Sequence, residues 1–157
     1  MNFGKTFAWF QWASTQAADY VIKLDTDVSA NWHLLLSWTR KMRPPAYFGT
    51  ILTYSGCGSQ SYCPPEGCTD FKKSCWIYMS GGMYGLSKDV VDSISRCAYA
   101  RRHKIQHEDL QVGLYVKHCA HDVHLHNMRN GLMWCHSKTD IDMHDIARGR
   151  VPAGCHK

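Results

Sequence analysis

The chain has 157 residues and a mass of 18.0 kDa, with 45% hydrophobic and 20% charged residues. This length and apolar content suffice for one domain with a sizeable core, and they exclude a miniprotein held together by disulfides alone. Basic residues outnumber acidic ones by 18 to 13, but the basic groups at 40–43 and 101–104 are too short, and too poor in aromatic neighbours, for a nucleic-acid surface.

The first half of the chain alternates helix-prone and strand-prone segments. Apolar residues at near-helical spacing predict a helix within 4–18, and the β-prone run 19–24 predicts a strand that ends in the acidic turn 25–27. The apolar residues within 32–38 predict a second helix, which must end before the pair of prolines at 44–45. A strand is predicted to follow over 46–53.

The second half continues this alternation. A strand is predicted over 76–79, then a tight strand-to-helix turn at Ser80-Gly81-Gly82, then a helix over 88–99 capped near Ser87. The remaining predicted segments are a helix over 109–120 and extended runs over 123–126 and 132–135. The alternation predicts an α/β layer architecture, in which ligands gather at the carboxyl ends of strands.

Four of the eight cysteines lie in a turn-rich segment at about 54–75. This segment has too few apolar residues to pack by itself, so it needs cross-links. Two disulfides are the favoured explanation. Zinc is the alternative, although the cysteine spacings depart from the paired C-x2-C pattern of structural zinc sites.

Asp25 and Asp27 are the first candidates for chemistry. Two carboxylates one residue apart at the end of a strand can point to a common side and hold a hard divalent ion, which in turn binds phosphate oxygens. Asp-x-Asp is also frequent in ordinary turns, where Asp caps the next helix. His136 lies at the exit of the last predicted strand and could complete an octahedral site, although a lone His is more often a surface residue.

Glu108 and Asp109 open a predicted helix, where the helix dipole favours an ionised carboxylate. An ordinary acidic first turn is the alternative. Gly81 and Gly82 permit close approach of the backbone to a ligand, but paired glycines serve a tight connection equally well. The histidines at 118, 121, 124 and 126 could form a second metal site, but a scattered polar strand face explains them more simply.

The order of these motifs resembles that of glycosyltransferase family 31, the group of β-1,3-galactosyltransferases, β-1,3-N-acetylglucosaminyltransferases and Fringe proteins. Residues 20–27 resemble the family's strand ending in D-D-D, with Thr26 in place of the middle Asp. Residues 78–87 resemble Y-x-S-G-G-G-Y-V-L-S, with Met83 at the third glycine and Gly85 at a branched position. Three shorter pieces resemble the K-T, E-D-V-x-x-G and V-H-S-R motifs, namely 5–6, 108–113 and 135–138.

The resemblance implies a GT-A fold, a Rossmann-like α/β architecture. Residues 1–157 are then the carboxyl-terminal part of a single catalytic domain, with a Cys-rich insertion at about 54–75. We expect the amino-terminal βα portion, and with it much of the nucleotide pocket, to lie outside these residues, so that activity of this part alone is an open question. The resemblance also implies the Golgi lumen, behind an amino-terminal membrane anchor that this sequence lacks.

The implied activity is an inverting hexosyltransferase that moves galactose or N-acetylglucosamine from a UDP-sugar to a hydroxyl of an acceptor glycan, on protein or lipid, in a β-1,3 linkage. The implied base is Asp109, and the implied ligands of Mn²⁺ are Asp25, Asp27 and His136. The residues implied to bind the donor or the acceptor are Asp25, Tyr78, Gly81, Gly82 and Glu108. The alternatives are an inactive, sugar-binding relative of the family and, less favoured, a Cys/His zinc-binding module.

Overall fold

The structure is a computed structural model that describes residues 4–54, 76–104, 107–128 and 134–136, the last three and residues 53–54 by their backbone alone. Nearly all of the Cys-rich segment predicted at about 54–75 lies outside these residues, so its two disulfides stay a prediction. The helices are α1 (Lys5–Ala13), α2 (Trp32–Thr39), α3 (Lys88–Arg96), α4 (Ala98–Arg102) and α5 (Glu108–Cys119). The strands are β1 (Tyr20–Leu24), β2 (Val28–Ala30), β3 (Ala46–Tyr54), β4 (Trp76–Ser87), β5 (His124–Asn127) and β6 (Trp134–His136).

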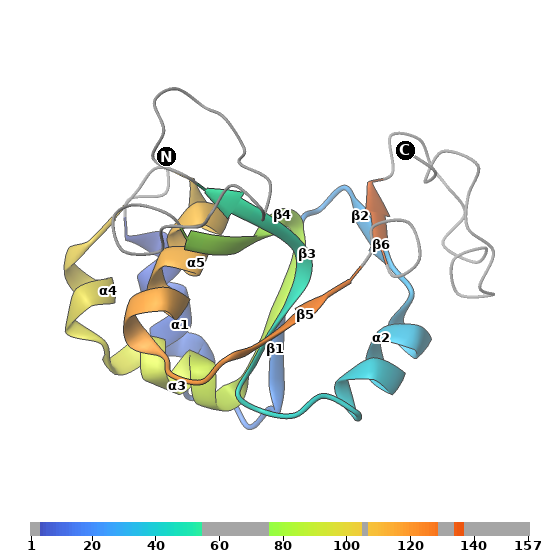
Figure 1. Cartoon of the computed structure of the whole chain (residues 1–157), viewed down its shortest axis with the longest axis horizontal. Helices are drawn as coiled ribbons and strands as arrows, with labels where there is room; N and C mark the ends of the chain where they lie inside the picture. The colour runs from blue at the N-terminus through green and yellow to red at the C-terminus, as the bar shows by residue number, and fades with distance from the viewer. Residues whose placement is uncertain (1–3, 55–75, 105–106, 129–133, 137–157) are drawn as a thin grey trace.

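A four-stranded sheet in the order β1-β4-β3-β5 forms the middle of the molecule. Strand β4 is antiparallel to both of its neighbours, and β5 is parallel to β3. Helices α1, α3, α4 and α5 gather on one side of the sheet and α2 on the other (Figure 1), and β2 and β6 form a separate antiparallel pair. The predicted layering of helices on a sheet is confirmed, but the described sheet is mostly antiparallel, and the GT-A fold itself stays a prediction.

The predicted strand-to-helix turn at Ser80-Gly81-Gly82 is wrong, because β4 continues through these residues to Ser87. Their pairing with β3 is nevertheless interrupted. Gly49 lies opposite Tyr84 but Ile51 lies opposite Met79, so residues 80–83 have a single β3 residue across from them. Extra residues in one strand make a bulge, which glycines accommodate readily. The glycines thus bend a long strand, and the helix begins only after it.

The predicted helix over 88–99 is also wrong in its extent. Helix α3 ends at Arg96, Cys97 has extended backbone angles, and α4 begins at Ala98. Cys97 is joined by a disulfide to Cys119 at the end of α5, with 5.7 Å between the Cα atoms. The spacing of the apolar residues does not predict this break. The break lies at Cys97, whose disulfide partner is 22 residues away in the sequence.

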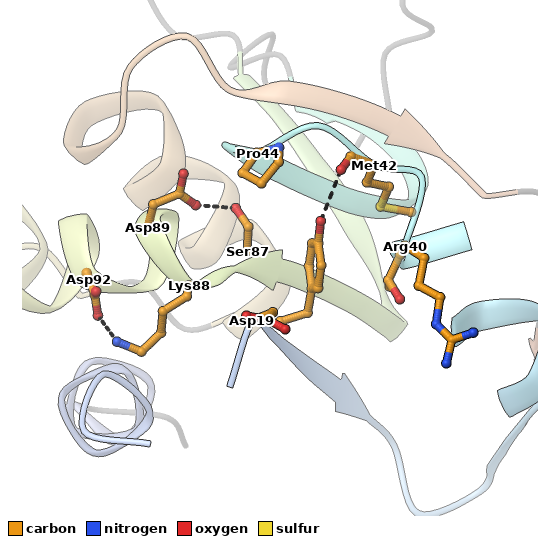
Figure 2. Close-up of a pocket in the computed structure, with 10 residues that line it drawn as sticks. Asp19, Arg40, Met42, Pro44, Ser87, Lys88, Asp89 and Asp92 are labelled. Atoms are coloured by element: carbon orange, nitrogen blue, oxygen red, sulfur yellow. Dashed lines mark hydrogen bonds and ion pairs between the residues drawn. The ribbon is translucent and has the colours of Figure 1, made fainter. Parts of the chain in front are cut away.

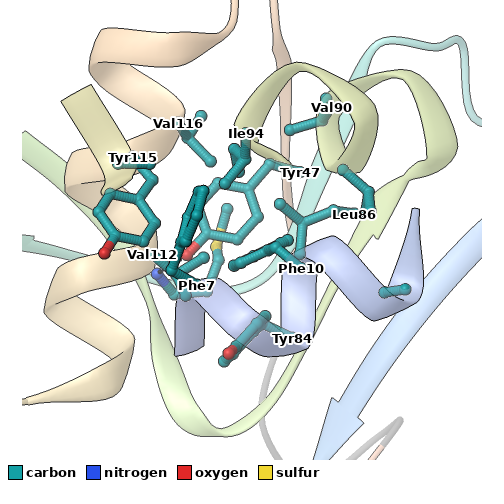
Figure 3. Close-up of a cluster of buried hydrophobic side chains, with 14 residues drawn as sticks. Phe7, Phe10, Tyr47, Tyr84, Leu86, Val90, Ile94, Val112, Tyr115 and Val116 are labelled. Atoms are coloured by element: carbon teal, nitrogen blue, oxygen red, sulfur yellow. Dashed lines mark hydrogen bonds between the residues drawn. The ribbon is translucent and has the colours of Figure 1, made fainter. Parts of the chain in front are cut away.

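Two apolar clusters hold the layers together. The larger one packs α1, α3 and α5 on the sheet, with Phe10, Tyr84 and Ile94 fully buried among its side chains (Figure 3). The second cluster lies beside α2 and β2 and contains Leu35 and Met83, both completely buried. Because β4 contributes to both clusters, it is buried from two sides, and this burial fixes its register.

Helix α5 lies unusually close to β4 at Gly113. A Cβ atom on Gly113 would be 2.5 Å from the Ile77 carbonyl oxygen and 2.5 Å from the Tyr78 Cβ. The indole Nε1 of Trp76 donates to the Leu110 carbonyl at 2.9 Å on the same helix. The absent side chain at Gly113 therefore sets how closely the amino-terminal turns of α5 approach the strand.

We predict that Gly113→Ala lowers the free energy of unfolding by about 2 to 3 kcal/mol, because the added methyl group meets backbone atoms that cannot turn away. Urea unfolding of the variant measures this. The control is Gly81→Ala, whose Cβ would be 3.4 Å or more from its nearest neighbours, an ordinary contact. Equal midpoints for Gly113→Ala and the parent protein would show that the close approach is not a constraint.

Candidate functional site

The acidic turn lies at the carboxyl end of β1 and is fixed by backbone hydrogen bonds. The Asp25 N–H donates to the Gly82 carbonyl at 3.0 Å, and the Val28 N–H donates to the Asp25 carbonyl at 3.1 Å. The first bond extends the β1–β4 pairing by one residue, and the second closes a tight turn. Asp27 is exposed and Asp25 is half-buried. The turn therefore presents two carboxylates beside the bulge in β4.

Asp109 faces that bulge from the opposite side. It lies in the first turn of α5, and its Oδ1 accepts from the Leu110 N–H at 2.8 Å. Its Oδ2 would be 3.4 Å from a Cβ placed on Gly81. The bare glycine thus leaves a small space next to this carboxylate, at the point where β4 loses its pairing with β3.

Glu108, the neighbour of Asp109, is held by other side chains. Its Oε1 accepts from the hydroxyl of Tyr84, and its Oε2 lies 3.5 Å from the Lys23 Nζ. Burial, followed by the nearby Glu108 charge, raises the pKa of Tyr84 well above its ordinary value, so the phenol keeps its proton and donates. Two partners orient Glu108, whereas Asp109 keeps an oxygen directed at Gly81.

Lys23 joins these pieces and was not predicted from the sequence. Its ammonium group donates to Asp25 Oδ1 and to the Gly81 carbonyl, and it lies 3.5 Å from Glu108 Oε2. The signal that could have found it is local: a lysine inside an apolar strand, two residues before Asp25 and therefore on the same face of the chain. Tyr84 was missed as well, because its contact with Glu108 is made across 24 residues.

Of the residues predicted to bind a divalent ion, Asp25 and Asp27 share one turn, and the backbone of His136 lies close to that turn. The backbone of His136 in β6 pairs opposite Val28, the residue after Asp27. Two carboxylates and an imidazole form a mixed donor set that suits Mn²⁺. The chemistry of the donors therefore fits such an ion. Among the side chains that the structure describes, which do not include His136, no three His, Cys, Asp or Glu residues gather as a metal site.

Tyr78, a predicted ligand contact, and Met83, a departure from the family pattern, both lie in the packed interior. Tyr78 is 2% exposed and lies under Gly113 of α5, so it supports the packing of the helix; its contact with a ligand stays a prediction. Met83, which stands at a glycine position of the family pattern, is completely buried in the cluster beside α2. The side chain of Met83 therefore fills the core.

A pocket of about 510 Å³ opens at the other end of the sheet, where β1 begins and β4 ends (Figure 2). Polar groups in it are engaged with one another: Lys88 Nζ donates to Asp92 at 2.6 Å, and the Tyr20 hydroxyl donates to the Met42 carbonyl at 3.3 Å. The carboxylates of the candidate site do not line this pocket.

The histidine group has no common centre in the described residues. His118 stacks on Tyr99 with 4.1 Å between the ring centroids, and His103 stacks on the same ring at 3.8 Å. His126 has a buried Nε2 for which the described residues supply no hydrogen-bond partner. Burial, followed by the neighbouring His124, lowers the pKa of His126, so its ring is neutral near pH 7. His118, His121 and His124 are exposed, and the described histidines do not gather as a second metal site.

None of the helices in the described part of the chain combines the length and apolar character needed to cross a membrane. No curated protein gives a significant match. The family model described as galactosyltransferase matches residues 2–129. This range is most of the chain and contains the acidic turn, the glycine bulge and the Glu-Asp start of α5. The chain belongs to the galactosyltransferase family of glycosyltransferases.

Proposed function

We propose that this protein transfers a hexose, with galactose as the first candidate, from a UDP-sugar to a hydroxyl of an acceptor glycan, with inversion and formation of a β-1,3 linkage. Membership of the galactosyltransferase family supports a sugar donor and a glycan acceptor. The observation that carries the assignment of residues is the difference between two adjacent carboxylates: Glu108 is engaged by Tyr84 and Lys23, and Asp109 is directed at the space beside Gly81.

In this proposal Asp109 accepts the proton of the acceptor hydroxyl. The oxygen forms a bond to the anomeric carbon from the face opposite the diphosphate, and the bond to the diphosphate breaks, so the configuration inverts in one step. Asp109 lies in the first turn of α5, next to Gly81 of the bulge. Glu108 orients the site, and Gly81 and Gly82 let the sugar approach the backbone.

A divalent ion, Mn²⁺ in the first instance, would be held by Asp27 and His136, with Asp25 beside the nucleotide sugar. When bound, it offsets the negative charge that grows on the diphosphate leaving group. The family is typically found in the Golgi lumen, and we propose the same location for this protein, behind an amino-terminal anchor. A lumenal setting is oxidising, which agrees with the Cys97–Cys119 disulfide.

We predict that Asp109→Asn lowers kcat at least about a hundredfold, because the amide cannot accept the proton, and leaves donor affinity within about threefold. Initial rates with UDP-galactose and titration of the donor by calorimetry measure the two quantities.

The matched control for that experiment is Asp92→Asn. Asp92 is also a carboxylate in a helix, but it pairs with Lys88 in α3, away from the bulge, and its variant should keep the parent kcat. If Asp109→Asn turns over at the parent rate, Asp109 is not the base.

We also predict that Gly81→Ala lowers kcat/KM at least about tenfold with little change in the thermal midpoint. The added methyl group makes only ordinary contacts with Asp109, so the fold tolerates it, but it occupies the space where the reacting groups would meet. Steady-state kinetics and a thermal melt on the same sample measure both effects. Unchanged kinetics in a folded variant would place the sugar elsewhere.

A further inference from the structure

We infer that Lys23 is a positioning residue for sugar transfer: it fixes the spacing between the acidic turn after β1 and the carboxylates at the start of α5. This inference rests on the proposed function. The Lys23 ammonium group contacts all three segments that meet at this site: the acidic turn at Asp25, the bulge at Gly81 and the start of α5 at Glu108.

The ammonium group makes two hydrogen bonds, to Asp25 and to the Gly81 carbonyl, and a longer ion pair with Glu108. A lysine has three N–H donors, and three acceptors surround this one: Asp25 Oδ1, the Gly81 carbonyl and, at 3.5 Å, Glu108 Oε2. The Lys23 side chain is 18% exposed. Its partners Asp25 and Glu108 are 43% and 32% exposed, so water screens both ion pairs in part, and the bond to the Gly81 carbonyl adds a contact that does not depend on a second charge.

Lys23 also holds the backbone of Gly81 in place, a role beyond neutralising the nearby carboxylates. In the bulge, residues 80–83 have lost their regular pairing with β3. The ammonium group donates to the Gly81 carbonyl, and Asp109 lies next to the position of a Gly81 Cβ. Lys23 therefore fixes the position of the Gly81 backbone relative to Asp109, as well as the distance between Asp25 and Glu108.

Without the ammonium group, Glu108 keeps Tyr84 as its partner but loses the cation that separates it from Asp25. The two carboxylates then repel one another, and the first turn of α5 loses one of the contacts that hold it against the bulge. A misplacement of about 1 Å at reacting groups can cost about a hundredfold in rate. The effect should fall on kcat, because the groups that bind the donor remain.

The test compares Lys23→Met, Lys23→Arg and the matched control Lys88→Met in the full-length protein. Lys88 has the same kinds of partner, a carboxylate of Asp92 at 2.6 Å and the Ser14 carbonyl at 2.8 Å, but it lies at the far end of β4 (Figure 2). We expect Lys23→Met to lower kcat at least about thirtyfold with KM for UDP-galactose within about threefold. Lys23→Arg should recover part of the loss, and Lys88→Met should keep the parent kcat.

A second readout does not depend on catalysis. Hydrogen exchange in residues 108–112 should become at least about fivefold faster in Lys23→Met and stay unchanged in Lys88→Met, because Lys23 contacts Glu108 at the start of α5 whereas the hydrogen-bond partners of the Lys88 ammonium group are Asp92 and Ser14. A kcat within threefold of the parent in folded Lys23→Met, or unchanged exchange in 108–112, would overturn the inference. If the parent protein transfers no sugar, the proposed function fails, and the exchange comparison still decides whether Lys23 holds the start of α5.

Discussion

One ammonium group, that of Lys23, holds together the part of the molecule where chemistry is proposed. It donates to Asp25 and to the Gly81 carbonyl, and it lies 3.5 Å from Glu108. These partners come from the end of a strand, a bulge in the middle of another strand, and the start of a helix. No hydrophobic contact could fix their carboxylates in place, because carboxylates stay close together only when a cation or hydrogen-bond donors lie between them.

Packing supplies the frame for that contact. Gly113 lets α5 approach β4 closely, and this approach brings Asp109 against Gly81. The two residues of β4 that depart from the family pattern lie in the core. The Met83 side chain is completely buried, and a Cβ on Gly85 would be 2.1 Å from the ring of Phe48. Met83 and Gly85 therefore belong to the packing of β4, and the outer carboxylates of the acidic turn, Asp25 and Asp27, are kept.

The sequence predicted what is encoded locally. Asp25 and Asp27 at a strand end, and Glu108 and Asp109 at a helix start, follow from short patterns of apolar and capping residues. The bulge in β4 was not predictable, because alternation along one strand carries no information about which partner residues are skipped. The reach of Lys23 to Gly81 spans 58 residues, and the Cys97–Cys119 pair is one of many that eight cysteines allow. Such contacts depend on the tertiary fold.

The most direct measurement of the central claim is the anomeric configuration of the product. The full-length protein would be incubated with UDP-galactose, Mn²⁺ and a panel of glycan acceptors, and the new linkage would be followed by proton NMR from the start of the reaction. Direct displacement assisted by Asp109 predicts a β-linked galactose as the first product formed from the α-linked donor. An α-linked product, or transfer through a covalent galactosyl-protein, would contradict the account.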